Sequence, residues 1–190
     1  MPRDPAVFID RDGTLNEEVG YLNHPQRLGL IPGAAEAVRK LNSSPFKAVV
    51  ATNQSGIAKG YVSEALLGAI HEELIRQLKA EGAYLDAIYV CTHHPTEGEL
   101  PYRRLCDCRK PKPGLLLKAA SDLDLDLSRS FVVGDKISDV ELAHRVNAKG
   151  ILVLTGYGLG ERDFRRHLWP VAPDYIAENL LQAVEWILVR

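Results

Sequence analysis

Short apolar runs alternate with longer amphipathic segments along most of this 190-residue chain. Five of the runs have the length and apolar composition of buried strands. Alternation of such strands with helices predicts an α/β fold, in which a Rossmann-like parallel sheet is sandwiched by helices. We expect one domain spanning residues 1–190. The predicted strands are Ala6–Ile9, Phe46–Ala51, Ala87–Val90, Phe131–Val133 and Ile151–Leu154.

Three segments have the apolar spacing of amphipathic helices. Ser63 can cap the first helix and Gly82 can end it, whereas Pro113-Gly114 opens the second. The segment Tyr157–Pro173 is polar, and we expect a connection with little regular structure there. The apolar positions of the three helices are Leu67, Ile70, Leu74 and Leu78; Leu116, Leu117 and Ala120; and Leu180, Leu181, Val184, Ile187 and Leu188.

Polar motifs follow the first four predicted strands, at residues 10–14, 52–56, 91–112 and 134–139. The carboxyl ends of parallel strands meet at one edge of the sheet, and ligands bind beyond that edge. The sequence therefore predicts one site assembled from four separate segments.

The first of these motifs is Asp10-Arg11-Asp12-Gly13-Thr14. Two carboxylates separated by one residue can act as a nucleophile and as its acid–base partner, provided that the chain turns both into one opening. Glycine permits the tight turn that this requires. A solvated acidic turn would explain the motif equally well if it stood alone.

Two further motifs suit a phosphate group. Residues 52–56 offer a hydroxyl, amides and a glycine-exposed backbone, which can bind phosphate oxygens. Residues 109–114, Arg-Lys-Pro-Lys-Pro-Gly, offer three cations on a loop that proline stiffens. Taken singly, the first would be read as an ordinary polar turn and the second as a solvated basic loop.

The motif at 134–139 brings two more carboxylates to the same edge. Convergence of Asp10, Asp12 and Asp135 would be repulsive unless a cation lay among them. Hard oxygen ligands beside phosphate-binding groups favour Mg²⁺ over zinc. We assign Asp139 to the first turn of a helix or to a supporting role beside the metal ligands.

All three cysteines lie between residues 91 and 108, in the pairs Cys91-Thr92-His93 and Cys106-Asp107-Cys108. Three thiolates and one imidazole complete the tetrahedral set of a structural zinc site, with His94 as an alternative to His93. Free thiol pairs are the other interpretation. Residues 94–105 have no apolar stripe, so bound metal would be needed to order a zinc loop of about residues 91–110.

Together, the strand-end motifs resemble those of the haloacid dehalogenase superfamily of phosphohydrolases. The motifs that match, in the order of that family, are Asp10-x-Asp12-Gly13-Thr14, Thr52, Lys110 and Gly134-Asp135-x-x-x-Asp139. The resemblance covers nearly the whole chain. No insertion is long enough to form the cap domain that usually encloses such sites, so we expect a capless member whose zinc loop forms the rim.

The resemblance implies a role for each matching residue. Asp10 would attack phosphorus and carry an aspartyl-phosphate, and Asp12 would act as general acid and then as general base. Mg²⁺ would be held by Asp10, the backbone carbonyl of Asp12, and Asp135. Thr52 and Lys110 would stabilise the transferring phosphoryl group.

Within the superfamily, the zinc loop is similar to those of the heptose 1,7-bisphosphate phosphatase and histidinol-phosphate phosphatase families, and the first match is closer. That resemblance implies Mg²⁺-dependent removal of the 7-phosphate during synthesis of nucleotide-activated heptose precursors. A carboxylate at Glu17 or Glu18 would suit histidinol phosphate and keeps that alternative open. The expected substrate-binding residues are Glu18, Tyr21, Asn53, Gln54, Ser55, Arg109 and Lys136.

Composition and motifs also argue against nucleic-acid-binding, membrane-spanning and non-catalytic phosphate-binding proteins. The formal charge of −2 gives no reason to expect nucleic-acid binding. No apolar stretch approaches a membrane span, and Pro2, Asp4 and Pro5 interrupt any signal peptide, so we expect a cytoplasmic monomer acting on a small sugar bisphosphate. A response-regulator receiver domain would lack the second aspartate at position 12. A non-catalytic, zinc-stapled phosphate-binding module would lack Asp10 or Asp12.

Overall fold

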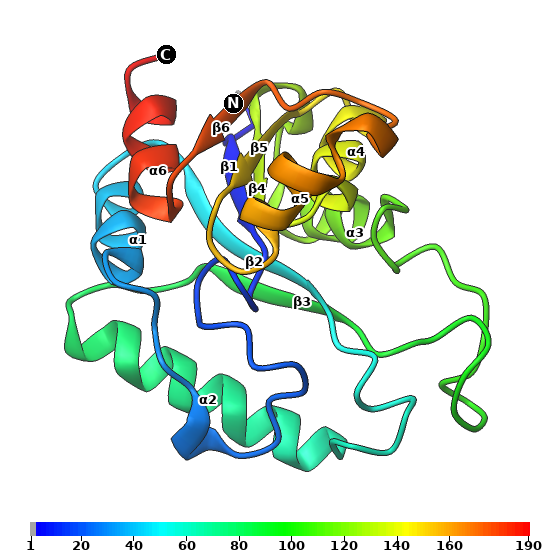
Figure 1. Cartoon of the computed structure of the whole chain (residues 1–190). Helices are drawn as coiled ribbons and strands as arrows, with labels where there is room; N and C mark the ends of the chain where they lie inside the picture. Colours follow the sequence, from blue (N-terminus) through cyan, green and yellow to red (C-terminus); the bar gives the residue numbers. More distant parts are fainter. Residues whose placement is uncertain (1–2) are drawn as a thin grey trace.

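Six parallel strands form a single sheet in the order β3-β2-β1-β4-β5-β6 in the computed structural model, which describes residues 3–190 (Figure 1). This agrees with the predicted fold class. The register pairs Phe8 of β1 with Val49 of β2 and with Val132 of β4. The strands are β1 Ala6–Ile9, β2 Lys47–Asn53, β3 Ala87–Cys91, β4 Phe131–Gly134, β5 Lys149–Val153 and β6 Tyr175–Ala177.

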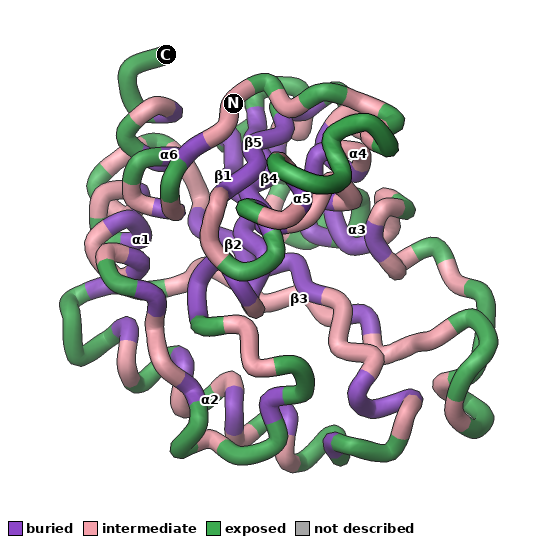
Figure 2. The backbone as a smooth tube through the Cα atoms, in the orientation of Figure 1, coloured by how far each residue is buried: buried purple, intermediate pink, exposed green. Residues whose placement is uncertain are grey.

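Helices cover both faces of the sheet because successive strand residues point to opposite faces. In β1, Val7 and Ile9 pack against α1, α2 and α6, whereas Ala6 and Phe8 pack against α3 and α4. Figure 2 shows the central strands buried between these two layers. The helices are α1 Ala34–Asn42, α2 Glu64–Ala80, α3 Gly114–Leu123, α4 Ile137–Arg145, α5 Gly158–Phe164 and α6 Leu180–Leu188.

The strand order reverses beside β1: from there the chain builds outward first through β2 and β3 and then through β4 to β6. Such a reversal leaves a crevice beyond the carboxyl ends of the central strands, where α/β proteins bind their ligands. The ends of β1, β2 and β4 therefore define where a site can form.

The prediction for Tyr157–Pro173 was wrong, because α5 occupies Gly158–Phe164 and a 3-10 turn occupies Arg166–Leu168. Sequence spacing also missed the edge strand β6. These elements contain only three to seven residues, too few to establish a period. Within residues 3–190, none of the helices combines the length and apolarity needed to cross a bilayer.

Candidate active site

A cavity of about 340 Å³ opens at the carboxyl ends of β1, β2 and β4. It draws its lining from the loops after these strands and from the end of the zinc loop, which supplies part of the rim in place of a cap domain. All of the residues predicted to act on or bind substrate line it: Asp10, Asp12, Glu18, Tyr21, Thr52, Asn53, Gln54, Ser55, Arg109, Lys110 and Lys136.

Lys110 holds Asp10 at the floor of the cavity. Its Nζ lies 2.7 Å from Asp10 Oδ1 and 2.7 Å from Asp139 Oδ1, and it donates to the Ala51 carbonyl at 3.0 Å. Burial disfavours the ammonium, but the two carboxylates outweigh burial and raise the pKa of Lys110. A permanent positive charge therefore lies beside the Asp10 carboxylate.

Asp10, Asp135 and Asp139 form a buried acidic cluster, with one oxygen from each within 4.8 Å of the others. Burial and the nearby charge of Asp10 raise the pKa of Asp135 to about 7. Asp135 Oδ1 is buried without a hydrogen-bond partner. A hard divalent cation would neutralise this cluster and bind this oxygen, which is 3.4 Å from the Lys136 ammonium but not hydrogen-bonded to it, so the donor set fits Mg²⁺. Asp139 lies in the first turn of α4, as expected, and also joins the cluster.

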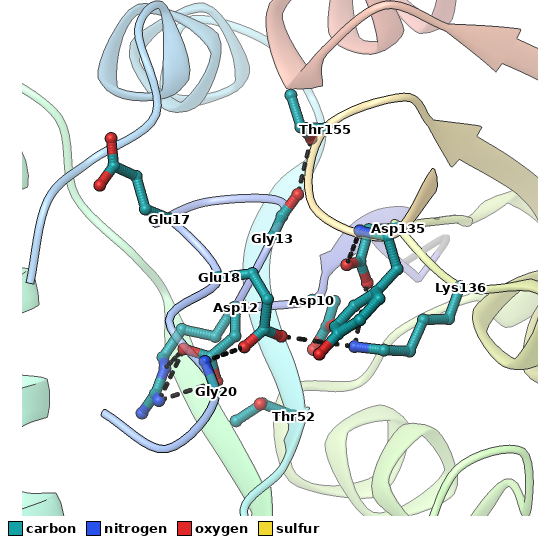
Figure 3. A network of polar contacts seen from close by, with 12 residues as sticks. Asp10, Asp12, Gly13, Glu17, Glu18, Gly20, Thr52, Asp135, Lys136 and Thr155 are labelled. Carbon is teal, nitrogen blue, oxygen red and sulfur yellow. Dashed lines mark hydrogen bonds and ion pairs between the residues drawn. The ribbon is translucent and has the colours of Figure 1, made fainter. Parts of the chain in front are cut away.

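The loop after β5 fixes the geometry of the motif that follows β1 (Figure 3). Thr155 Oγ1 donates to the Gly13 carbonyl at 2.6 Å, and the Tyr157 N–H donates to Asp135 Oδ2 at 2.9 Å. Gly13 has a φ of +81°, and a Cβ there would overlap the Asp135 carboxylate. Only glycine lets the backbone approach so closely.

The Asp12 carboxylate lies outside the acidic cluster and is gripped by other donors. Arg11 Nη2 lies 2.9 and 2.8 Å from its two oxygens, Asn16 Nδ2 donates at 3.0 Å and Gln54 Nε2 donates at 2.8 Å. Burial opposes ionisation, yet the Arg11 charge and these hydrogen bonds lower the pKa of Asp12. That its backbone carbonyl binds Mg²⁺ stays a prediction.

Lys136 and Glu18 face each other across the rim (Figure 3). Lys136 Nζ lies 3.6 Å from Glu18 Oε2, 3.4 Å from Asp135 Oδ1 and 4.4 Å from the Tyr157 ring centroid. The Gly20 N–H donates to Glu18 Oε1 at 2.7 Å, which fixes the loop that carries Tyr21. An incoming anion would compete with Glu18 for Lys136.

Four potential metal ligands converge at the end of β3. Cys108 Sγ lies 3.1 Å from Cys91 Sγ and 3.4 Å from Cys106 Sγ, and His93 Nδ1 lies 3.3 Å from Cys108 Sγ. Ligands of tetrahedral zinc lie ~3.5–3.8 Å apart, given Zn–S bonds of ~2.3 Å. Cys91 Sγ lies within that range of Cys106 Sγ, at 3.7 Å, and of His93 Nδ1, at 3.8 Å, whereas the contacts to Cys108 Sγ are shorter. The donor types and their convergence fit a tetrahedral zinc site. His94 instead turns away, and its Nδ1 accepts the Glu97 N–H at 2.9 Å.

The Cys/His cluster connects directly to the cavity. Arg109 Nη1 donates to the His93 carbonyl at 3.1 Å. The Lys110 N–H donates to Asn53 Oδ1 at 3.1 Å, and Asn53 Nδ2 donates to the Lys110 carbonyl at 3.3 Å. The side chain of Asn53 therefore holds the Lys110 backbone as well as lining the cavity.

Comparison with known proteins identifies the family. A family model described as HAD-hydrolase-like matches residues 107–183. The chain is 48% identical to the D-glycero-D-manno-heptose-1,7-bisphosphate 7-phosphatase of Thermosynechococcus vestitus, over 98% of this chain and 96% of that protein. The chain belongs to this phosphatase family. It is also 40% identical to the Escherichia coli K12 D-glycero-beta-D-manno-heptose-1,7-bisphosphate 7-phosphatase, over 97% of this chain and 88% of that protein.

A solved structure of the same family has the same fold. The D,D-heptose 1,7-bisphosphate phosphatase from B. bronchiseptica, complexed with magnesium and phosphate, superposes with a TM-score of 0.84 at 32% identity. The match covers 97% of this chain and 98% of that chain. The family resemblance predicted from the strand-end motifs is therefore confirmed.

Sequence reasoning missed two residues behind the cavity, Arg11 and His71. Arg11 is 1% exposed, and its Nη1 lies 3.1 Å from His71 Nε2 on α2. For a helical histidine such as His71, the sequence alone favours a surface or packing role. Its position four residues after Leu67, beside Ile70 in the apolar stripe, was the available signal that it faces inward.

His71 makes stability pH-dependent. Burial and then the Arg11 charge lower its pKa from 6.5 to about 4. Between pH 6.5 and about 4, His71 therefore binds a proton in the unfolded chain but not in the folded chain. The free energy of unfolding falls as the pH drops through this range. Between pH 7.5 and 5.0, we expect the free energy of unfolding of wild type to fall by up to about 2 kcal/mol more than that of His71→Gln, as measured by urea unfolding. Equal losses would contradict the shifted pKa.

Proposed function

We propose that this protein is a Mg²⁺-dependent phosphatase that removes the 7-phosphate of D-glycero-D-manno-heptose 1,7-bisphosphate. The observation that carries the proposal is the Asp10 carboxylate, which lines the cavity, pairs with the Lys110 ammonium and belongs to the acidic cluster with Asp135 and Asp139. Names of the relatives supply the substrate. The product would feed synthesis of nucleotide-activated heptose.

The reaction would proceed in two displacements. One oxygen of Asp10 would attack phosphorus as the bond from phosphorus to the sugar oxygen breaks. Asp12, which must first take up a proton because Arg11 and its other donors favour the carboxylate, would donate that proton to the leaving oxygen. Water then attacks the aspartyl-phosphate while Asp12 takes a proton from it, which releases inorganic phosphate and restores Asp10. Thr52 and Lys110 would stabilise the charge on the transferring group.

The acidic cluster would hold the metal. Asp10 and Asp135 would bind Mg²⁺ together with the carbonyl of Asp12, and Asp139 would orient Lys110 beside them. When bound, Mg²⁺ supplies neutralisation of the negative charge on the phosphoryl group.

Zinc would have a structural role at Cys91, His93, Cys106 and Cys108. The set leaves no open ligand position, which is typical of structural zinc. Burial raises the pKa of the Cys91 thiol, so the metal is needed to keep that side chain as a thiolate. We infer that zinc fixes the loop that presents Arg109 and Lys110.

Phosphate release tests the proposed function. Both anomers of heptose 1,7-bisphosphate and histidinol phosphate are assayed in parallel with and without Mg²⁺. Strong Mg²⁺-dependent preference for a heptose anomer is the expected result. Preference for histidinol phosphate would contradict the assigned substrate and would point to Glu18 as the partner of its ammonium group.

Arg109→Ala should impair bisphosphate hydrolysis selectively. The half-buried guanidinium lines the cavity and can bind the phosphate that is not cleaved. We expect kcat/KM for the bisphosphate to fall on the order of 10- to 100-fold, with p-nitrophenyl phosphate affected less than about threefold. Arg109→Lys, which keeps the charge, is the control. Equal losses on both substrates would show that Arg109 does not select the second phosphate.

A further inference from the structure

A buried network supports Asp12 from behind the cavity. Arg11 lies between Asp10 and Asp12 in the sequence, but its side chain is turned into the protein and is 1% exposed. Its Nη2 binds both Asp12 oxygens and also donates to Gln54 Oε1 at 3.1 Å. The cavity lining contains Asp12 and Gln54 but not Arg11. Arg11 therefore fixes the carboxylate without reaching the substrate.

His71 accepts from the other side of the same guanidinium. Arg11 carries only donors and is always charged, so the 3.1 Å contact between Nη1 and His71 Nε2 requires Nε2 to be an acceptor. His71 must then be neutral with its proton on Nδ1. His71 binds Nη1 of Arg11, whereas Asp12 is bound by Nη2. Because the two contacts hold different nitrogens, the orientation of the guanidinium plane is fixed.

We propose that His71 is a positioning residue for catalysis, acting through Arg11 to aim the Asp12 carboxylate at the leaving group and at the attacking water. The proposal rests on the proposed function of Asp12. His71 belongs to α2, whose stripe of Leu67, Ile70 and Leu74 anchors it in the core. A core helix thereby fixes the orientation of the Asp12 side chain, which lies on the loop after β1.

Two substrates with different leaving groups can distinguish this positioning role of His71 from a purely structural role. A sugar alkoxide needs a proton from Asp12 to depart, whereas p-nitrophenolate departs without one. Hydrolysis of the aspartyl-phosphate needs Asp12 as a base with either substrate. Misdirection of Asp12 should therefore slow both steps with the sugar and only the second step with the aryl phosphate.

The test compares His71→Leu, which removes the acceptor, with His71→Gln, whose amide oxygen can accept from Arg11. For His71→Leu, we expect kcat on the bisphosphate to fall on the order of 10- to 100-fold while KM changes less than about threefold. With p-nitrophenyl phosphate, rapid mixing should show a burst of about one nitrophenolate per site and then slow turnover. His71→Gln should recover most of kcat.

His144→Leu is the matched control. This histidine also lies on a helix and also has one side-chain partner, but that partner is Asp174 Oδ2 at 2.8 Å, and neither His144 nor Asp174 lines the cavity. Its turnover should equal wild type. If His71→Leu does not fold, Arg11→Lys replaces it in the test. Lysine keeps the positive charge but cannot bind Asp12 and His71 through separate guanidinium nitrogens.

Three results would overturn the proposal: unchanged kcat in His71→Leu, equal losses on both substrates without a burst, or no recovery in His71→Gln. The proposed function is judged separately, by phosphate release from wild type. A wild-type enzyme that fails on the bisphosphate but hydrolyses the aryl phosphate would refute the assigned substrate, and the nitrophenolate burst would still test His71.

Discussion

Replacing Asp10 by asparagine should lower kcat on the order of 10⁴- to 10⁶-fold, because the amide cannot attack phosphorus. The protein should remain folded. Asparagine has nearly the same shape, Lys110 keeps its ion pair with Asp139, and one of three mutually repelling carboxylates is removed. Phosphate release, trapping of the phosphoenzyme by acid quench, and thermal unfolding measure these outcomes.

The matched control for this variant is Asp122→Asn. Asp122 binds Lys118 and Tyr89 on the surface, and its loss should leave turnover unchanged. Residual activity of a few per cent in Asp10→Asn, with no trapped phosphoenzyme in wild type, would exclude Asp10 as the nucleophile. Activity retained in Asp10→Asn but lost in Asp12→Asn would exchange the two proposed roles.

Replacing His93 by glutamine should remove zinc and disorder the loop between residues 94 and 105. That loop has no apolar stripe of its own, so binding of zinc at the proposed site would supply its folding free energy. We expect a thermal midpoint lower by about 10 °C, corresponding to a loss of ~3–5 kcal/mol. Bisphosphate hydrolysis should fall at least about tenfold, because Arg109 is hydrogen-bonded to the His93 carbonyl.

His94→Gln is the control for this prediction. His94 is the next residue and is also half-buried, but its Nδ1 accepts the backbone N–H of Thr96 and Glu97 instead of facing the sulfurs. It should retain about one zinc per chain by elemental analysis. Zinc lost from His94→Gln and kept in His93→Gln would reverse the ligand assignment. Zinc absent from wild type would refute the site.

The α/β fold and the location of the site follow from local features of the sequence. The apolar stripe of α2 predicted its buried face, and Ser63 caps α2 by accepting the Leu66 N–H at 3.1 Å. The polar motifs fell at strand ends, and parallel strands bring their carboxyl ends to one edge whatever the details of packing. The Cys-x-His and Cys-x-Cys pairs likewise predicted the four side chains that converge at the end of β3.

The sequence by itself therefore determined which segments meet and which reactive side chains they carry. Tertiary structure alone decided how each side chain is used. Arg11 points into the core, His71 accepts from it across 60 residues of chain, and Thr155 binds the Gly13 carbonyl from beyond β5. The physical reason is that a buried donor must be satisfied by whatever acceptor packing brings near, and no period along the chain encodes that neighbour.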